Sequence, residues 1–372
     1  MSGLILDSLE VRGFRGFRHL QIERLGRVNL IVGKNNVGKS SLLEALQLYA
    51  KRADPTLIFE FLKSRDESKL VRLNRYMDSE YEDLLLPLKY LFYGRNDVRT
   101  FAEPIQIGPI NSPEGILSIA VKWYLLQSDE QGIARRVLLE VDEYAGADNP
   151  SPRFTIQLGS QAAVNYQLNP NSQTTRLLRS ELKEINSVYA KTNFLSKVRI
   201  GELWDNIALT ELDKEVLEAL RIVAPGVEGF TLVDDVRFSK RERVPVVKIA
   251  GIDERLPLGH LGDGMQRVLS ITLALVNSRD GILLVDEIEN GLHYLIQPDL
   301  WRLVFRLAHR LNVQVFATTH SWDCIKAFQE AAQEDDQEGL LIRLQSRMGE
   351  ISATVYNEEE LKVATREQIE VR

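Results

Sequence analysis

Apolar residues follow two patterns along the chain, and together they predict an α/β fold. Residues 28–32, 281–285 and 313–317 are short, mainly apolar runs, typical of strands covered on both faces. Residues 40–50 and 268–276 carry apolar side chains at helical spacing. The apolar helical positions are Leu42, Leu43, Ala45, Leu46 and Leu48, then Val268, Leu269, Ile271, Leu275 and Val276. We therefore predict a parallel sheet between helices, and such sheets bind ligands outside the carboxyl ends of their strands.

The middle of the chain has a different pattern. Alternating apolar and polar residues predict antiparallel strands at 115–127, 134–144 and 153–158, with a hairpin connection at 146–152. Flanking segments predict a charged helical stretch at 57–91 and a compact helical insert at 175–224. The apolar positions of this insert are Leu209, Leu212, Val216, Leu217 and Leu220. We expect an antiparallel layer and a helical insert beside the parallel sheet.

A phosphate-binding loop connects the first apolar strand to the first helix. It consists of Gly33, Lys34, Asn35, Asn36, Val37, Gly38, Lys39, Ser40 and Ser41. The two glycines permit backbone torsions that let successive N–H groups converge on phosphate oxygens at the positive end of the helix. Lys39 would reach the β- and γ-phosphates, and Ser40 would ligate Mg²⁺. The alternative, a glycine turn with a surface lysine, does not explain why the full pattern stands between a strand and a helix.

Polar side chains end the other two apolar strands. Asp286 and Glu287 close the run at 281–285; we expect Asp286 to hold Mg²⁺ and Glu287 to polarise the attacking water as general base. Taken alone, this pair is equally compatible with a solvated strand end. His320 follows 33 residues after Glu287 and would face the γ-phosphate, although a histidine before Ser321 could instead cap the next helix. The remaining histidines interpreted as structural or surface residues are His19, His260 and His309.

A second glycine-bounded helix start lies at Leu261, Gly262, Asp263, Gly264 and Met265. A chain with one nucleotide site does not need two helix starts suited to anions. The second becomes useful if it contacts a nucleotide held by another subunit. We therefore expect composite sites in a homodimer.

These motifs together resemble the ABC-type ATPase heads of the RecF, SMC and OLD (overcoming lysogenization defect) group. In that group the phosphate-binding loop reads Gly-x-Asn-x-x-Gly-Lys-Ser, as it does here. Residues 261–267 look like the ABC signature, Asp286 and Glu287 like Walker B, 289–293 like the D-loop, and His320 like the switch histidine. Residues 9–17 look like the opening strand of such heads, in which a basic residue at the position of Arg15 approaches the nucleotide. The resemblance implies an ATPase that uses ATP and Mg²⁺.

The resemblance also implies a domain arrangement, and the chain departs from the family pattern at some positions. We expect one head over 1–372, with an N-lobe at 1–170, a helical insert at 171–225 and a C-lobe at 226–372. The signature has Gly262 where transporter-type signatures place a serine, so any γ-phosphate contact there would come from backbone N–H groups. The Q-loop glutamine and an adenine-stacking aromatic are not assigned.

Two segments of the chain indicate which branches of this group it does not resemble. About 220 residues lie between the phosphate-binding loop and the signature without sustained heptads, which excludes a long-armed SMC protein. Only 52 residues follow His320, with strand-like runs at 339–344 and 351–356 and a short helix at 358–365. That is too short for the TOPRIM nuclease domain of OLD proteins, so we expect no nuclease activity here and a separate effector.

Composition changes this picture little. The chain has 372 residues, 44% of them hydrophobic, a single cysteine and no apolar run near the roughly 18 residues of a membrane span, so we expect a cytosolic protein. The formal net charge of −7 argues against a whole-surface nucleic-acid binder. Two local basic patches could contact nucleic acid, but we interpret both as solvated faces interleaved with acidic residues. They comprise Arg12, Arg15, Arg18, Arg24 and Arg27, and Arg237, Lys240, Arg241 and Arg243.

Four functions can be weighed against these observations. The leading hypothesis is an ATP-dependent dimeric switch or sensor that controls a partner effector, as in nuclease-linked antiviral systems. A RecF-like repair ATPase that closes on duplex DNA is the alternative. Asn35, Gly262 and the long insertion argue against a transporter subunit, and the complete Asp286, Glu287 and His320 set argues against a scaffold that binds ATP without hydrolysing it.

Overall fold

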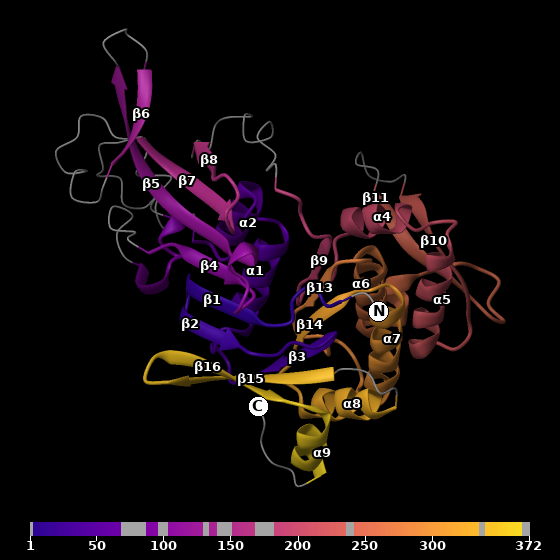
Figure 1. The fold of residues 1–372 in the computed structure, drawn as a ribbon. Coiled ribbons are helices and arrows are strands. Elements are labelled where there is room, and N and C mark those ends of the chain that lie inside the picture. Colours follow the sequence, from indigo (N-terminus) through magenta and orange to yellow (C-terminus); the bar gives the residue numbers. More distant parts are fainter. Residues whose placement is uncertain are drawn as a thin grey trace.

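A computed structural model shows an α/β architecture in which two large sheets lie side by side, with helices between and around them (Figure 1). The residues it describes are 3–67, 87–95, 103–128, 134–139, 151–167, 182–235, 242–334 and 339–366. In none of these stretches is a helix long and apolar enough to cross a membrane.

The central sheet carries the parallel strands. Its order in the described part of the chain is β16-β15-β3-β14-β13-β9, and only β16 runs antiparallel to its neighbour. These strands are β3 (Val28–Val32), β9 (Ser187–Ala190), β13 (Ile282–Val285), β14 (Gln314–Thr318), β15 (Gly339–Arg347) and β16 (Glu350–Tyr356). The prediction of a parallel sheet is thus confirmed, and the carboxyl ends of β3, β13 and β14 lie at one edge.

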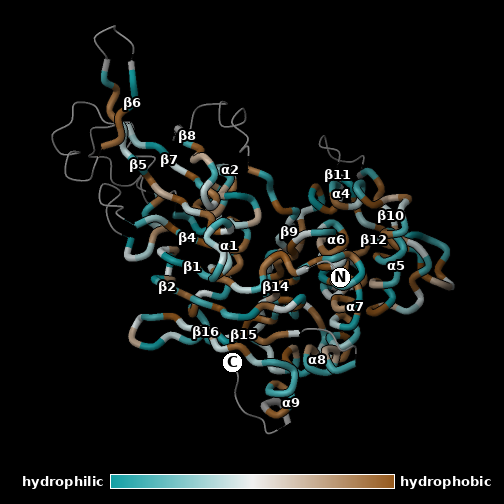
Figure 2. Tube along the Cα trace, viewed as in Figure 1, coloured by the Kyte–Doolittle hydropathy of each residue, from teal (hydrophilic) through white to brown (hydrophobic). Residues whose placement is uncertain are grey.

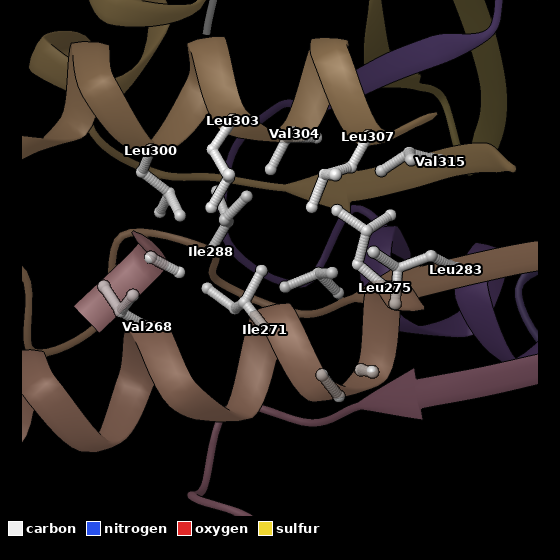
Figure 3. Packing of buried hydrophobic residues seen from close by; sticks show 14 of the residues in the cluster. Val268, Ile271, Leu275, Leu283, Ile288, Leu300, Leu303, Val304, Leu307 and Val315 are labelled. Carbon is white, nitrogen blue, oxygen red and sulfur yellow. The ribbon is translucent and has the colours of Figure 1, made fainter. Parts of the chain in front are cut away.

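Helices cover both faces of this sheet. α1 (Lys39–Ala50) packs on one face, whereas α6 (Asp263–Asn277) and α7 (Gln297–Arg310) pack on the other. Alternate β13 residues therefore belong to different cores: Leu283 packs with α6 and α7 (Figure 3), and Leu284 packs on the α1 side. Because neither face of β13 meets water, its run is apolar throughout. Figure 2 shows hydrophobic residues gathered on these central strands.

The second large sheet is antiparallel and follows the order β2-β1-β4-β5-β7-β8 among the described residues, with β6 paired to β5. Its strands are β1 (Leu9–Phe14), β2 (Phe17–Ile22), β4 (Ile105–Gly108), β5 (Leu117–Ser128), β6 (Ala134–Leu139), β7 (Ser151–Leu158) and β8 (Val164–Gln167). The predicted antiparallel layer is confirmed. The opening strand expected at 9–17 ends earlier than predicted: β1 stops at Phe14, and Arg15, which has a positive φ, lies in the turn that leads into β2.

The helical insert predicted at 175–224 also needs correction. Within its described part, β9 is a strand of the central sheet, paired in parallel with β13. The helices that follow are α4 (Lys197–Asp205) and α5 (Glu211–Val223), which buries Val216 and Leu220. Leu209 precedes α5 and is 99% exposed, so it does not belong to the apolar face. A strand forms at 187–190 because pairing with β13 outweighs the local helical pattern.

The remaining described elements surround these layers. A small sheet of β10 (Val227–Asp235), β11 (Glu242–Ile249) and β12 (Leu256–Pro257) packs beside α4 and α5. The other helices are α2 (Pro55–Ser64), α8 (Trp322–Gln333) and α9 (Glu358–Arg366). The strands and helix predicted after His320 are confirmed as β15, β16 and α9. Residues 68–86 of the charged stretch, 140–150 around the hairpin connection, and Arg237, Lys240 and Arg241 lie outside the described residues.

Candidate functional site

The loop from Gly33 to Gly38 connects β3 to α1 in a conformation that glycine permits. Gly33 has a φ of 146°, and a Cβ there would lie 2.5 Å from the Leu344 carbonyl oxygen. Gly38 has a φ of 102° and is the N-cap of α1, without a side-chain cap. No acidic residue stands in the first turn of α1. The first N–H groups of α1 are thus available to an anion at the positive end of the helix.

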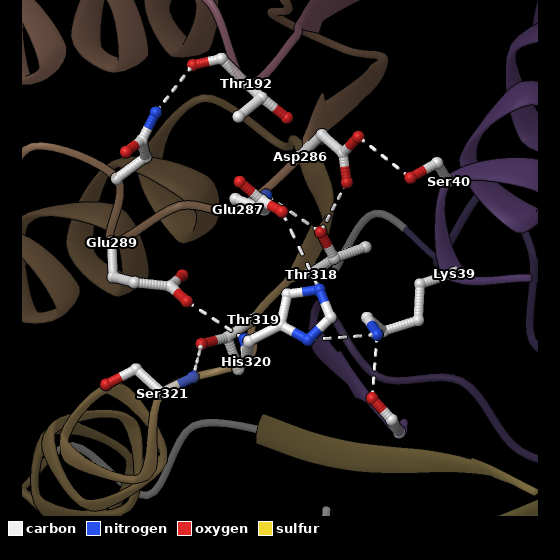
Figure 4. A network of polar contacts seen from close by, with 12 residues as sticks. Lys39, Ser40, Thr192, Asp286, Glu287, Glu289, Thr318, Thr319, His320 and Ser321 are labelled. Carbon is white, nitrogen blue, oxygen red and sulfur yellow. Dashed lines mark hydrogen bonds and ion pairs between the residues drawn. The ribbon is translucent and has the colours of Figure 1, made fainter. Parts of the chain in front are cut away.

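Lys39 lies at the start of α1 with its ammonium turned back onto this loop. Its Nζ donates to the carbonyl oxygens of Gly33 at 2.7 Å and Lys34 at 3.1 Å, and it lies 3.3 Å from His320 Nδ1 (Figure 4). Burial lowers the pKa of Lys39, while Asp286 and nearby glutamates oppose that shift. A buried cation held by carbonyl oxygens has hydrogen bonds that phosphate oxygens can replace.

Asp286 joins the ends of three elements. Its Oδ2 accepts a hydrogen bond from Ser40 Oγ at 3.0 Å, and its Oδ1 accepts one from Thr318 Oγ1 at 2.6 Å. Among the described residues there is no cluster of three or more His, Cys, Asp or Glu side chains suited to a metal. Ser40 and Asp286 supply the hard oxygen donors that Mg²⁺ prefers, and that ion usually takes its other ligands from water and phosphate. This pair therefore fits a magnesium ion bound together with a nucleotide.

Glu287 follows in a strained turn that directs it towards the histidine. Its φ is 48°, which is uncommon for a residue other than glycine. Its N–H donates to Thr318 Oγ1 at 2.8 Å, and its Oε1 lies 3.6 Å from His320 Nε2. The N–H of His320 donates to Glu289 Oε1 at 2.9 Å. Glu287 and His320 are about equally exposed, at 38% and 37%, so both reach the space above α1.

These groups line a cavity of about 860 Å³. Its walls combine the phosphate-binding loop, the two strand ends and a region near the end of α2. Its lining residues are Arg15, Gly16, Asn35, Asn36, Gly38, Lys39, Ser40, Ser41, Arg65, Glu67, Tyr90, Gly94, Arg95, Glu287, His320 and Ile351. Its volume lies within the range of nucleotide-sized ligand pockets.

Arg15 lies in the cavity wall as part of a charge cluster. Its Nε is 2.6 Å from Glu44 Oε2 and its Nη1 is 2.9 Å from Glu67 Oε1. Arg65 pairs with the other oxygen of Glu44 at 2.9 Å. Burial raises the pKa of Glu44 although both arginines favour its charged form. The predicted approach of Arg15 to a nucleotide is compatible with this position.

The signature-like segment is placed differently. The short helix η7 (Leu258–Leu261) precedes Gly262, whose φ is 87° and which caps α6 without a side-chain hydrogen bond. Gly262 and Asp263 are exposed, and none of the five residues from Leu261 to Met265 lines the cavity. Gly264 packs against the carbonyl of Gly291, which belongs to the D-loop-like segment. The segment thus presents a helix start to solvent, away from the chain's own phosphate-binding loop.

Two families of ATPases match separate parts of the chain. Residues 5–151 match the family described as "AAA ATPase domain", and residues 216–323 match the family described as "AAA domain, putative AbiEii toxin, Type IV TA system". The chain is an ATPase with the fold of an ABC-type head. The resemblance seen in its motifs, the fold class and the prediction of an ATPase are confirmed.

Relatives of this ATPase head extend along most of its length. A Helicobacter pylori protein named ATP/GTP phosphatase is 24% identical over 388 aligned residues, covering 95% of this chain and 96% of the relative. The OLD nuclease of Thermus scotoductus is 23% identical, covering 85% of this chain and 59% of its own length. A solved SMC head bound to the C-winged helix domain of ScpA has the same fold, with a TM-score of 0.50, 11% identity and coverage of 95% and 98%.

Several residues at or near the site were not identified from the sequence motifs. Thr318 lies in a strand predicted for its apolar pattern, yet its hydroxyl joins Asp286 to the Glu287 backbone. Arg267 ends the signature-like segment but turns inward to the Walker B turn. Tyr90 and Arg95 line the cavity without any diagnostic spacing. Thr318 could have been identified from the sequence, because it is a threonine at the end of an apolar strand, just before the polar residues Thr319 and His320. The sequence holds no comparable sign for Tyr90 or Arg95.

Three arginines of the basic patches pair with acidic residues. Arg12 pairs with Glu10 at 2.8 Å, and Arg18 with Glu350 at 3.4 Å. Arg243 pairs with Asp205 at 2.5 Å. His19 Nε2 contacts Glu10 at 2.7 Å, while His260 and His309 are exposed. These positions agree with the interpretation of the first patch and of the three histidines as structural or surface features; of the second patch, only Arg243 belongs to the described residues.

Proposed function

We propose that this ATPase head is a dimeric switch that closes around two ATP molecules and reopens after hydrolysis. The observation that carries the proposal is the separation between two glycine-started helices. α1 opens into the cavity beside Asp286, Glu287 and His320, whereas α6 begins at an exposed Gly262 outside it. In a composite site, the α6 start of one head would cover ATP held by the α1 start of the other.

Within one head, each residue has a separate task. Lys39 would leave the Gly33 and Lys34 carbonyls to bind the β- and γ-phosphates. Ser40 and Asp286 would hold Mg²⁺, which when bound offsets negative charge on the phosphates. Glu287 would accept a proton from the attacking water, and His320 would donate a hydrogen bond to the γ-phosphate. Thr318 holds the two carboxylate-bearing residues in a common frame.

The exclusion of water explains why the dimer would be needed. The cavity is open in one chain, and Glu287 is 38% exposed. Covering it with a second head would strengthen every electrostatic contact around the γ-phosphate, because the local dielectric constant falls. ATP binding and hydrolysis would then change the contact between two heads, which is what a switch requires.

Light scattering after size-exclusion chromatography tests this proposal on the full chain. Glu287→Gln keeps the shape of the side chain but removes the base, so it should bind ATP with Mg²⁺ and elute as a dimer, while the nucleotide-free protein elutes as a smaller species. A Glu287→Gln, Lys39→Ala double variant is the matched control and should not dimerise. A mass unaffected by ATP in the Glu287→Gln protein would contradict the composite-site switch.

We extend the proposal to a separate effector protein that binds one state of the dimer, closed or open, and has an activity of its own. This extension rests on the resemblance to two-component antiviral systems and on the relative named OLD nuclease, which this chain matches over 59% of the relative's length. Co-purification of the trapped Glu287→Gln dimer with the product of a neighbouring gene, and not of the Lys39→Ala protein, would support it. Tight, salt-sensitive binding of duplex DNA only in the presence of ATP would favour the RecF-like alternative instead.

A further inference from the structure

Arg267 is an arginine of α6 whose guanidinium is fully buried beneath the Walker B turn. It is 0% exposed. Its Nη1 donates to the Lys191 carbonyl at 2.8 Å, and its Nη2 donates to the carbonyls of Asp286 at 2.6 Å and Glu287 at 2.8 Å. Its Nε lies 3.5 Å from the Ile288 carbonyl oxygen. One side chain therefore contacts three successive carbonyls of the segment that bears the catalytic carboxylates.

This arrangement is costly and needs an explanation. Arg267 forms no ion pair with a carboxylate among the described residues. Burial lowers the pKa of its guanidinium to about 10, while the charges of Glu289, Asp286 and Glu287 oppose that shift. A buried charge without an ionic partner is unfavourable compared with an apolar side chain of similar length. Packing of α6 alone would be satisfied by methionine or leucine. The planar fork of donors is the property that only arginine supplies.

The carbonyls that it binds belong to a strained turn. Glu287 has a φ of 48°, and this conformation brings the carbonyls on either side of it towards α6. A non-glycine residue with positive φ persists only where surrounding contacts hold it. The same turn directs the Glu287 carboxylate to within 3.6 Å of His320. The guanidinium thus stabilises the backbone conformation on which the direction of the proposed base depends.

Arg267 also connects the Asp286–Ile288 turn to the start of α6. Arg267 lies in the second turn of this helix, whose N-cap is Gly262. Because a helix moves as a rigid element over so short a distance, displacement of its start also displaces the guanidinium. Gly264 packs against the Gly291 carbonyl, so the helix start and the segment after Glu287 are already in contact.

We propose that Arg267 is a positioning residue for ATP hydrolysis, which holds the Asp286–Ile288 turn so that Glu287 faces the cavity and makes this geometry depend on the position of α6. The second half rests on the proposed function, in which the α6 start contacts ATP held by the other head. Closure on one nucleotide would then align the base for the other nucleotide through Arg267. Hydrolysis at the two sites would be coupled within each chain.

Two substitutions in the full chain test this role. Arg267→Met keeps the length but removes the fork, and we expect kcat to fall about 100-fold, as when a reacting group is misplaced by about 1 Å. Arg267→Lys keeps a cation that cannot span the carbonyls and should recover part of that loss. The KM for ATP should change less than about threefold in both, because neither the phosphate-binding loop nor the cavity lining includes Arg267.

Arg52→Met is the matched control. Arg52 is also buried, at 8% exposure, and also donates to backbone carbonyls, those of Lys183 and Tyr49, but it lies beyond the other end of α1. It should lower the midpoint of thermal unfolding without the fall in kcat. If Arg267→Lys, the milder change, hydrolysed ATP at the wild-type kcat, or if kcat fell equally in the Arg52→Met protein, the positioning role would be overturned.

A further measurement separates this inference from the proposed dimer. The Arg267→Lys change is combined with Glu287→Gln, and ATP-driven dimerisation is measured. Dimerisation together with a lowered kcat in the Arg267→Lys protein supports positioning by Arg267. If Glu287→Gln alone fails to dimerise, the composite site fails; the kcat of Arg267→Lys then decides the local role of Arg267 independently.

Discussion

The starts of α1 and α6 use the same local structure in two different surroundings. Each helix follows a glycine with positive φ, 102° at Gly38 and 87° at Gly262, and neither has a side-chain cap. At α1, Lys39 is only 6% exposed and the neighbouring strand ends complete the site. At α6, a Cβ placed on Gly262 would meet no described atom within 4 Å. One chain thus completes the first anion site, and we infer that a second molecule completes the other.

The largest effect should follow from removing the ammonium at the α1 start. Lys39→Ala should weaken ATP binding by about 100-fold, since a hydrogen bond to a charged group contributes up to about 3 kcal/mol. Isothermal titration calorimetry with a non-hydrolysable ATP analogue measures this change. The control is Lys51→Ala at the far end of α1, where Lys51 pairs with Glu184 at 3.1 Å. Equal affinities of the two variants would refute the assignment of Lys39.

The next effect concerns the exposed helix start. Gly264→Asp adds a second carboxylate, next to Asp263, to the first turn of α6, where ATP of the other head would lie. We expect hydrolysis to fall about 30-fold, equivalent to about 2 kcal/mol of lost interaction with the helix dipole.

Mixing this variant with Lys39→Ala sharpens the comparison. A heterodimer of the two contains one site with both defects and one site with none, so an equal mixture with random assortment should regain roughly a quarter of the wild-type activity if the two sites act independently. Coupling of the two sites through Arg267 would lower the activity below that quarter. The measurement is a phosphate-release assay on each variant and on their mixture. Activity of the mixture no greater than the mean of its components would contradict independent composite sites; it is the result expected either from sites built within one chain or from full coupling of the two sites.

A smaller effect is expected at Thr318, whose hydroxyl joins Asp286 to the backbone of Glu287. Thr318→Val keeps the shape but removes the hydroxyl, which leaves the Glu287 N–H without its acceptor. We expect kcat to fall about tenfold and the free energy of unfolding to decrease by about 1.5 kcal/mol. The control is Thr272→Val in α6: Thr272 is fully buried, and its hydroxyl has no hydrogen-bond partner among the described residues. Denaturant titration should show little loss for that control.

The smallest effect is a pH dependence of ATP binding. Because burial lowers the pKa of Lys39 below its ordinary value of 10.5, this ammonium loses its proton earlier than a free lysine as the pH rises. Bound phosphate would favour the protonated form, so ATP binding should take up protons in the window just below pH 10.5, and affinity should decline through it. Calorimetry in buffers of different ionisation enthalpy measures this uptake. The same uptake in Lys39→Ala would assign it to another group.

Much of the site could be predicted because its motifs are local. The torsions of Gly33 and Gly38, the apolar run before Asp286 and the apolar run before His320 each depend on neighbours in sequence. The end of the opening strand could not be predicted, since it depends on the positive φ of Arg15 in the turn to β2. The strand β9 was missed, because Ser187–Ala190 is a strand through pairing with β13, far away in the chain.

The sequence by itself determined which chemical groups this ATPase head contains and on which kind of element each stands. Only the tertiary structure decided which of them meet: Thr318 bridges Asp286 and Glu287, Arg15 enters a cluster with Glu44, and Arg267 turns inward to the Walker B carbonyls. The physical reason is that these contacts depend on the register of parallel strands and on how α6 packs against them. Residues separated by dozens to hundreds of positions acquire that relation only when the core is formed.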